Sequence, residues 1–243
     1  MSGIDLHHVL FVDLECVPQH PSFYDLDDGL RALREKKAEK LTHIDEQLSP
    51  SELYENRSGI YAEFWKIICI SVWCFAKQDG DILQFRTKSF FGDDERELLL
   101  AFFELLDAHY NKPHHYLCGH NIREFDIPYI CRRALVNELD CPSILFDHGK
   151  KPWEVQHLDT MEMRKFGDKK TYTSLDLLTR VMWLPSPKVD ISGEQVARVY
   201  WDDQDLPRIT EYCERDVLAV AQLYLKFVRH PRRNEVIWGA TAS

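Results

Sequence analysis

The sequence lacks the features of a disulfide-stabilised or zinc-ribbon domain. Its seven cysteines are odd in number and no two form a CxxC pair, whereas both kinds of scaffold depend on paired cysteines. His114, His115 and His120 also lack the i, i+4 spacing and the nearby cysteine pair of a zinc finger, so we expect them to be loop or strand-edge histidines. The cysteine pattern indicates a reducing, cytoplasmic compartment.

The sequence also lacks an apolar run of the ~20 residues that a membrane-spanning helix needs. Its N-terminus has no basic segment ahead of its short apolar run. We therefore expect a soluble protein with no membrane partner. A hydrophobic content of 44% over 243 residues is enough for one substantial core or two small ones, and we expect a single α/β domain over residues 1–243.

Positive charge is scarce, because 30 lysines and arginines face 40 acidic residues and leave a formal charge of −10. This balance counts against a nucleic-acid partner, since phosphate binding depends largely on lysine and arginine. Enzymes that reach phosphates through divalent metals need only a local basic rim, however, and basic residues cluster at 31–40, 165–170 and 229–233. The first cluster is typical of a solvated helix face, with guidance of single-stranded substrate as the alternative.

Apolar runs predict an antiparallel meander in the first part of the chain. Residues 8–14 predict a buried strand, and residues 66–76 and 83–90 predict two neighbouring strands joined by a polar turn at 78–81. The charged stretch at about 25–60 has leucines at helical spacing and predicts an inserted helical excursion.

Helices and strands alternate over the rest of the chain. Helical spacing and capping residues predict helices at 94–109, 127–139, 174–182 and 206–229, with one more starting at the capping box Ser192–Gln195. Short strands are expected at 115–121 and 157–163. The pattern predicts an α/β protein with a mixed sheet of antiparallel and parallel strands flanked by helices.

Four acidic residues are candidates for one metal site. Asp13 and Glu15 lie two apart on the first strand and so point to the same face, although a strand that ends in solvated acids is the more common explanation of that pair alone. Asp126 opens a helix, and Asp216 lies in the last helix, four residues after Tyr212 and on the same helical face. Two hard divalent cations need several oxygen ligands, which four converging acids supply.

Three sequence blocks carry a family resemblance. FVDLECVP, GHNIREFDIPYICRRAL and YCERDVLAVAQLYL resemble, in that order, the three exonuclease motifs of the DEDD superfamily, and the tyrosine four before the last acid resembles its DEDDy branch. With HLDTMEMRKFG, SLDLL and VDISGEQV, the chain is similar to the stand-alone predicted 3′-to-5′ exonucleases related to the proofreading domain of B-family DNA polymerases. The resemblance covers most of the chain except parts of 25–60.

The resemblance implies a ribonuclease-H-like fold and a 3′-to-5′ exonuclease that uses two divalent cations, Mg²⁺ or Mn²⁺. It implies that Asp13, Glu15 and Asp216 hold one ion and that Asp13 bridges to a second ion, which Asp126 supports directly or through water. Tyr212 is expected to orient the attacking water, because a phenol with a pKa near ~10 is a poor base at neutral pH.

The resemblance also implies substrate-binding residues. Leu14 matches the first motif, and Asn121 and Phe125 match the second, where they would position the strand end. For Phe125, a core-packing role is an equal alternative. Asp159 is better explained as a structural cap than as part of the site's outer shell.

Nucleic-acid 3′ ends are the partner that the resemblance implies, with single-stranded DNA favoured over RNA and 5′-nucleotides as product. An exoribonuclease and a small nucleotide-ester hydrolase on the same site stay open as alternatives. A catalytically silent nucleic-acid-binding module is the rival from another class, and the complete set of acids and tyrosine favours the enzyme. We expect a role in DNA repair or nucleic-acid turnover.

Overall fold

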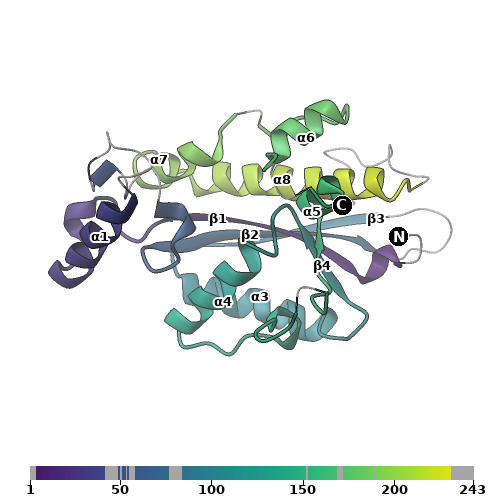
Figure 1. Cartoon of the computed structure of the whole chain (residues 1–243), viewed down its shortest axis with the longest axis horizontal. Coiled ribbons are helices and arrows are strands. Elements are labelled where there is room, and N and C mark those ends of the chain that lie inside the picture. Colours follow the sequence, from purple (N-terminus) through teal and green to yellow (C-terminus); the bar gives the residue numbers. More distant parts are fainter. Residues whose placement is uncertain are drawn as a thin grey trace.

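The computed structural model describes residues 4–41, 49, 51–52, 54, 58–76, 84–151, 153–168, 172–188 and 190–230. One five-stranded sheet, in the order β3-β2-β1-β4-β5, lies between two layers of helices (Figure 1). The strands are β1 (Val9–Pro18), β2 (Trp65–Ala76), β3 (Gln84–Phe91), β4 (Tyr116–Gly119) and β5 (Leu158–Asp159). The helices are α1 (Asp28–Leu41), α3 (Glu95–His109), α4 (Asp126–Val136), α5 (Thr160–Lys165), α6 (Leu175–Val181), α7 (Val196–Trp201) and α8 (Leu206–Phe227). Short 3-10 turns are η1 (Leu6–His8), η2 (Phe23–Asp25), η3 (Ser58–Ile60), η4 (Ser143–Leu145) and η5 (Gly193–Gln195).

The predicted mixed sheet is confirmed. β1, β2 and β3 form the expected antiparallel meander, while β4 runs parallel to β1 and β5 runs parallel to β4. The predicted polar turn at 78–81 lies outside the described residues. β1 is therefore a central strand, with β2 on one side and β4 on the other.

The alternation of β1 divides its side chains between two cores. Leu10, Val12 and Leu14 pack into a large core that includes residues of α3 and α4, whereas Val9 and Phe11 pack against α8. Figure 1 shows α8 on the face of the sheet opposite to α3 and α4. Since side chains two apart share a face, the residues that continue the series of Val9 and Phe11 turn toward α8.

Helix α8 follows the predicted pattern. The Asp205 side chain caps its N-terminus by accepting from the Arg208 backbone N–H, and the predicted apolar stripe is buried except at Phe227, which is half-buried. The capping box at Ser192–Gln195 is also present and leads through η5 into α7.

Two predictions about local structure need correction. The strand expected near 157–163 extends only over Leu158–Asp159, because the Asp159 side chain accepts from the backbone N–H groups of Met161 and Glu162 and starts α5 there. In the inserted excursion, residues 28–41 are helical as predicted, yet Leu33 is 61% exposed and Arg34 is fully buried. The basic cluster at 31–40 is therefore not simply a solvated face.

The expectations for cysteine and histidine hold in the structure. All seven cysteines are free thiols. His114 and His115 lie in the loop before β4, and the His120 ring is held between the Thr160 hydroxyl and the Thr173 carbonyl. Among the described residues, none of the helices combines the length and apolar character needed to cross a bilayer.

Candidate active site

Asp13 and Glu15 lie side by side on the α8 face of β1. In the sheet they pair with Ser71 and Cys69 of β2, and a bulge follows Glu15. Both side chains are half-buried. Burial raises the pKa of each carboxyl well above its ordinary value, and the Asp216 and Asp126 carboxylates raise it further. The predicted pair is thus a group of crowded, poorly solvated acids and not a solvated strand end.

Asp126 reaches the same place from the first turn of α4. β1 pairs with β4 only as far as Phe11, so the backbone of β1 beyond that point can meet another element. The Leu14 backbone N–H acts on the Asp126 carboxylate there and lowers its pKa, against the larger effect of burial. Asp126 is 4% exposed, and its burial raises its pKa to about 7.

The loop that delivers Asp126 has a fixed backbone. Asn121 adopts a left-handed conformation with φ of 68°, which asparagine tolerates better than most residues, and its N–H donates to Asp159 Oδ1 at 3.0 Å. A Cβ at Gly119 would lie 2.6 Å from the Ile122 Cβ, so only glycine fits. Asp159 thus fixes the loop and caps α5, which is the structural role predicted for it.

Buried ionic contacts hold the helix that carries Asp126. Arg133 of α4 donates to both oxygens of Glu95 on α3, and also to the Ala62 carbonyl at 2.7 Å. Glu95 accepts from the Ile67 N–H of β2 at 2.7 Å as well. Arg133 and Glu95 are 4% and 6% exposed, so this network ties α4, α3 and the sheet together beneath the site.

Helix α8 supplies Tyr212 and Asp216 to the acids. Asp216 is 9% exposed, and its Oδ1 is buried with no hydrogen-bond partner in the part of the chain that the structure describes. Burial raises the pKa of Asp216 to about 7, while the Tyr212 hydroxyl and Lys188 act in the opposite direction. Burial also raises the pKa of Tyr212, and the carboxylates of Glu15, Asp216 and Asp13 add to the shift.

Cys213 is an additional member of the cluster. One ligand atom from each of Asp13, Glu15 and Cys213 lies within 4.8 Å of the others. The Cys213 thiol is buried and donates to Asp13 at its backbone carbonyl, 3.4 Å away, and its Oδ2, 3.6 Å away. Because burial raises the pKa of the Cys213 thiol well above its ordinary value, we interpret it as a neutral donor that orients Asp13.

The three predicted substrate-binding residues lie around the acids in different environments. The Leu14 side chain is 5% exposed and belongs to the core on the opposite face of β1, so its backbone is the part nearest Asp126. Asn121 is half-buried. Phe125 is also half-buried, and its ring centroid lies 5.2 Å from that of Tyr129. Phe125 therefore packs against the core, which is one of the two roles expected from the sequence.

Comparison with known proteins identifies the family. The model of the predicted 3′-5′ exonucleases related to the exonuclease domain of PolB matches residues 60–234. The chain belongs to this family. The match includes Asp126, Tyr212 and Asp216, whereas Asp13 and Glu15 precede it, so their place beside the other acids rests on the position of β1 in the sheet.

A solved structure shares the fold of this exonuclease. The family B DNA polymerase from the hyperthermophilic archaeon Pyrobaculum calidifontis is similar over 97% of the chain, with 15% identity and a TM-score of 0.52, and the match covers 27% of the polymerase. The ribonuclease-H-like fold is thereby confirmed. A search of curated proteins found no match.

The acid cluster of the exonuclease fits divalent metal ions. Exonuclease domains of this kind use divalent metals, and hard cations prefer carboxylate oxygens. Burial raises the Asp13 pKa most, and the Asp216, Glu15 and Asp126 carboxylates raise it further, so the four acids interact electrostatically. Asp216 Oδ1 is buried and has no hydrogen-bond partner among the described residues. Because buried polar atoms normally have partners, this oxygen is available as a ligand for a cation.

Two residues near the acids escaped the sequence analysis. Lys188, on the exposed segment before α7, lowers the pKa of Glu15 and of Asp216. Tyr172, ahead of α6, is 73% exposed; partial burial of its hydroxyl raises its pKa, and the Asp126 charge adds to the shift. Lys188 directly precedes the VDISGEQV block, and this position could have indicated that it lies near the site. No pattern in the sequence indicated a role for Tyr172.

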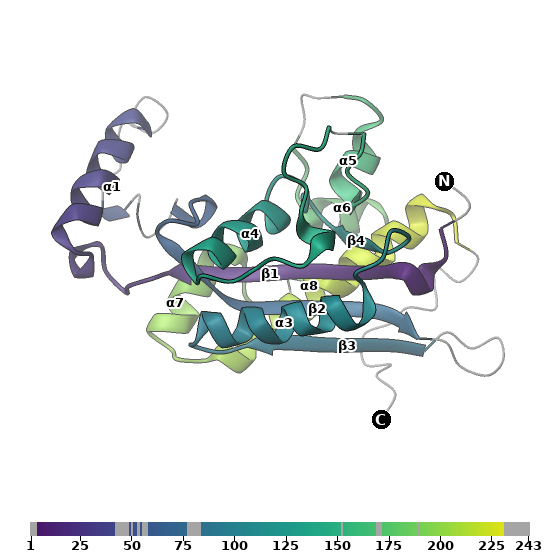
Figure 2. The same cartoon turned by 90° about the horizontal axis from the view of Figure 1, so that it is seen from below.

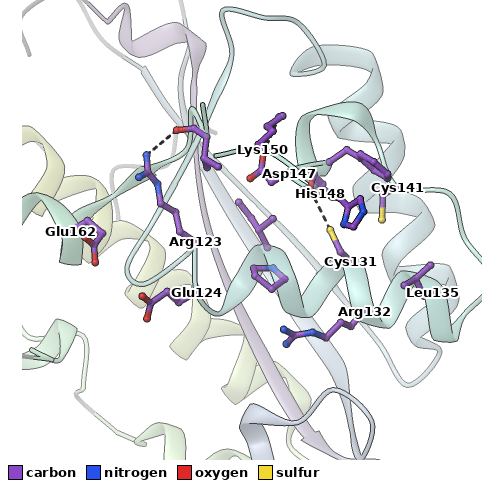
Figure 3. A pocket seen from close by; sticks show the side chains of 15 residues that line it. Arg123, Glu124, Cys131, Arg132, Leu135, Cys141, Asp147, His148, Lys150 and Glu162 are labelled. Atoms are coloured by element: carbon purple, nitrogen blue, oxygen red, sulfur yellow. Dashed lines mark hydrogen bonds and ion pairs between the residues drawn. The ribbon is translucent and has the colours of Figure 1, made fainter. Parts of the chain in front are cut away.

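A large cavity lies away from the acids. It has a volume of about 840 Å³ and borders the outward side of α4 (Figure 3). Arg123 crosses part of it to donate to the Val155 carbonyl at 3.1 Å, and the Cys131 thiol donates to the Leu145 carbonyl at 3.4 Å. None of the predicted site residues lines it, so this hollow is not the acid site.

Proposed function

We propose that this exonuclease hydrolyses the 3′-terminal phosphodiester bond of single-stranded DNA and releases 5′-nucleotides, with two Mg²⁺ or Mn²⁺ ions as cofactors. One observation carries the proposal: carboxylates from β1, α4 and α8 interact electrostatically, because Asp216, Glu15 and Asp126 all add to the effect of burial in raising the pKa of Asp13. Such repulsion is costly in a metal-free protein, and bound cations relieve it.

Each acid has a distinct place in this proposal. Asp13, Glu15 and Asp216 would hold one ion, and Asp13 and Asp126 would hold the second, Asp126 directly or through water. Bound there, divalent cations lower the pKa of the attacking water and stabilise the charge that develops on the phosphate and the departing 3′-oxygen. The Cys213 thiol keeps Asp13 oriented through its two contacts.

Tyr212 positions the attacking water. Its hydroxyl is buried and interacts with Asp216, and its pKa is raised, so the phenol keeps its proton at neutral pH. It therefore acts as a hydrogen-bonding group and not as the base. A Cβ added at Gly193 would lie 3.9 Å from the Tyr212 hydroxyl, so the absence of a side chain there leaves space beside this oxygen.

Groups around the acids favour a single strand as substrate. Lys188 supplies positive charge close to Glu15 and Asp216 and is placed to contact a phosphate. Tyr172 presents an exposed ring whose pKa the Asp126 charge, after burial, helps to raise, and bases of a single strand stack on such rings without sequence preference. Asn121 and Phe125, with the backbone at Leu14, position the terminal nucleotide.

The substrate and the direction of cleavage are tested with end-labelled oligonucleotides. Single-stranded DNA, double-stranded DNA and RNA, each labelled at the 5′ or the 3′ end, are incubated with Mg²⁺, Mn²⁺ or EDTA. We expect a ladder of shortened 5′-labelled DNA, immediate release of a labelled mononucleotide from 3′-labelled DNA, and no reaction with EDTA. Faster loss of RNA identifies the exoribonuclease alternative, and cleavage of nucleotide esters alone identifies the small-ester alternative. Binding without cleavage under every condition contradicts the proposal.

A further inference from the structure

A second group of metal-binding side chains lies at the opposite end of β1. Val9 of β1 pairs in parallel with Tyr116 of β4. The residues just ahead of the two strands, His8 and His115, therefore lie at the same end of the sheet, where both strands begin. His114 precedes His115 in the same loop. At ~3.3 Å per strand residue, Asp13 lies ~16 Å further along β1, so this edge, near the N-terminal end in Figure 2, is separate from the acids.

The three imidazoles form a compact group. Their ring centroids are 4.5 Å apart for His8 and His114, 4.5 Å for His114 and His115, and 5.5 Å for His8 and His115. One nitrogen from each ring lies within 4.8 Å of the others. The sequence excluded a zinc finger because the spacing was wrong, but the sheet adds His8, from more than a hundred residues earlier, to the adjacent pair.

One of the three rings has an unsatisfied nitrogen. His115 is 8% exposed, and its Nδ1 is buried with no hydrogen-bond partner among the described residues. The backbone around the group is already fixed, because the His115 N–H donates to the Lys112 carbonyl and the His8 N–H donates to the Asp5 carbonyl, both at 3.0 Å. The His115 ring also packs 5.4 Å from that of Tyr110.

We propose that His8, His114 and His115 bind one borderline transition-metal ion of the Zn²⁺ class, with the fourth position open to water. Three neutral imidazoles suit Zn²⁺ and not Mg²⁺, which prefers oxygen ligands. Tetrahedral zinc with bonds of ~2.0–2.1 Å places its nitrogens ~3.3 Å apart. The exposed His114 ring can close that gap by side-chain rotation, while Lys112 nearby opposes the ion's charge.

The ion links two segments that are distant in the sequence. It connects the turn before β1 to the loop before β4, at the end of the sheet where pairing between these two strands begins. Zinc held by three histidines therefore stabilises the folded state by mass action, because the unfolded chain lacks the preformed site.

The test is titration of the full chain with Zn²⁺ by calorimetry at pH 7.5. Two of the four site carboxylates are first removed by the double substitution Asp13→Asn and Asp216→Asn, which weakens competition from that site. In that background we compare the intact cluster with His114→Asn and His8→Asn, and with His148→Asn, an exposed histidine elsewhere. Circular dichroism checks that each variant is folded, and Co²⁺ serves as a second probe through its visible absorption.

We expect one Zn²⁺ per chain, an affinity at least ~10-fold weaker after either cluster substitution, and no change with His148→Asn. Thermal stability should rise with Zn²⁺ only while the cluster is intact. The proposal is overturned if the acid-neutralised chain binds no Zn²⁺, or if it binds Zn²⁺ equally well after His114→Asn and His8→Asn. The result is independent of nuclease activity, because the background variant has lost two of the acids proposed for cleavage.

Discussion

The Cys213 thiol of α8 donates to both the backbone carbonyl and the carboxylate of Asp13 on β1, 200 residues earlier in the chain. This contact aligns the last helix with the central strand at the point where the acids converge. It also lowers the pKa of Asp13, against the larger effect of burial. The contact therefore orients a proposed metal ligand without being one.

Cys213→Ala should slow cleavage by no more than ~10-fold, because loss of one weak neutral donor costs about 1 kcal/mol. The acid set stays complete in this variant, so saturating Mn²⁺ should restore most of the rate. The measurement is the rate of 5′-labelled DNA shortening as a function of Mn²⁺ concentration. A loss as large as that of Asp13→Asn would mean that Cys213 is itself a metal ligand.

The metal-free protein should lose stability as pH rises. Asp126 and Asp216 have pKa values of about 7 in the folded chain, above the ~3.9 of an unfolded aspartate. The folded state therefore binds more protons than the unfolded state between about pH 4 and 7, and the free energy of unfolding falls across that window. Thermal melts in EDTA from pH 4 to pH 8 measure the trend.

Asp216→Asn removes one of the repelling charges. At pH 7.5 in EDTA we expect it to raise the free energy of unfolding by at least ~1 kcal/mol, the value of about one pKa unit, whereas Asp107→Asn on the surface of α3 should change little. Added Mg²⁺ should stabilise the wild type more than Asp216→Asn. A destabilised Asp216→Asn protein in EDTA would contradict the charge-crowding account.

Arg133→Ala should destabilise the fold by about 3–5 kcal/mol, because it leaves the buried Glu95 charge without its partner. Arg132→Ala is the matched control, since Arg132 is an exposed neighbour on the same helix and such substitutions usually change stability by less than ~0.5 kcal/mol. Urea denaturation gives both values. A change below ~1 kcal/mol for Arg133→Ala would show that Glu95 finds another partner.

Tyr172→Ala should raise KM for single-stranded DNA about 10-fold with little change in kcat, since stacking of a base on an aromatic ring contributes about 1–3 kcal/mol. Phe146→Ala is the control, because Phe146 is 58% exposed and borders the cavity on the other side of α4. Steady-state cleavage of a short oligonucleotide measures both constants. Equal KM values for Tyr172→Ala and the wild type would remove Tyr172 from the proposed substrate path.

Local patterns predicted the elements that carry the acids. The alternation of residues 8–14 placed Asp13 and Glu15 on one face of β1, and the capping position of Asp205 marked the start of α8. Helix α5 was missed, although Asp159 was expected to act as a cap, because its six residues are too few to show helical periodicity. Local signals of this kind are strong only where periodicity extends over several turns.

The contacts that complete the site depend on tertiary structure. The thiol of Cys213 meets Asp13, and Lys188 approaches Glu15 and Asp216, only because α8 and the segment before α7 pack over β1. The burial of Arg34 in a charged, lysine-rich helix was likewise hidden, since its charge and spacing were typical of an exposed face. Sequence patterns report periodicity but not which distant segment covers a face.

The most direct test of the central claim is single-turnover cleavage of 5′-labelled single-stranded DNA by the wild type, Asp13→Asn and Asp216→Asn at saturating Mn²⁺, with Asp107→Asn as the control acid. We predict that both site variants lose cleavage by at least ~10³-fold while remaining folded and able to bind DNA, and that Asp107→Asn cleaves like the wild type. Cleavage near the wild-type rate in either site variant would show that the acids on β1 and α8 do not form the catalytic centre.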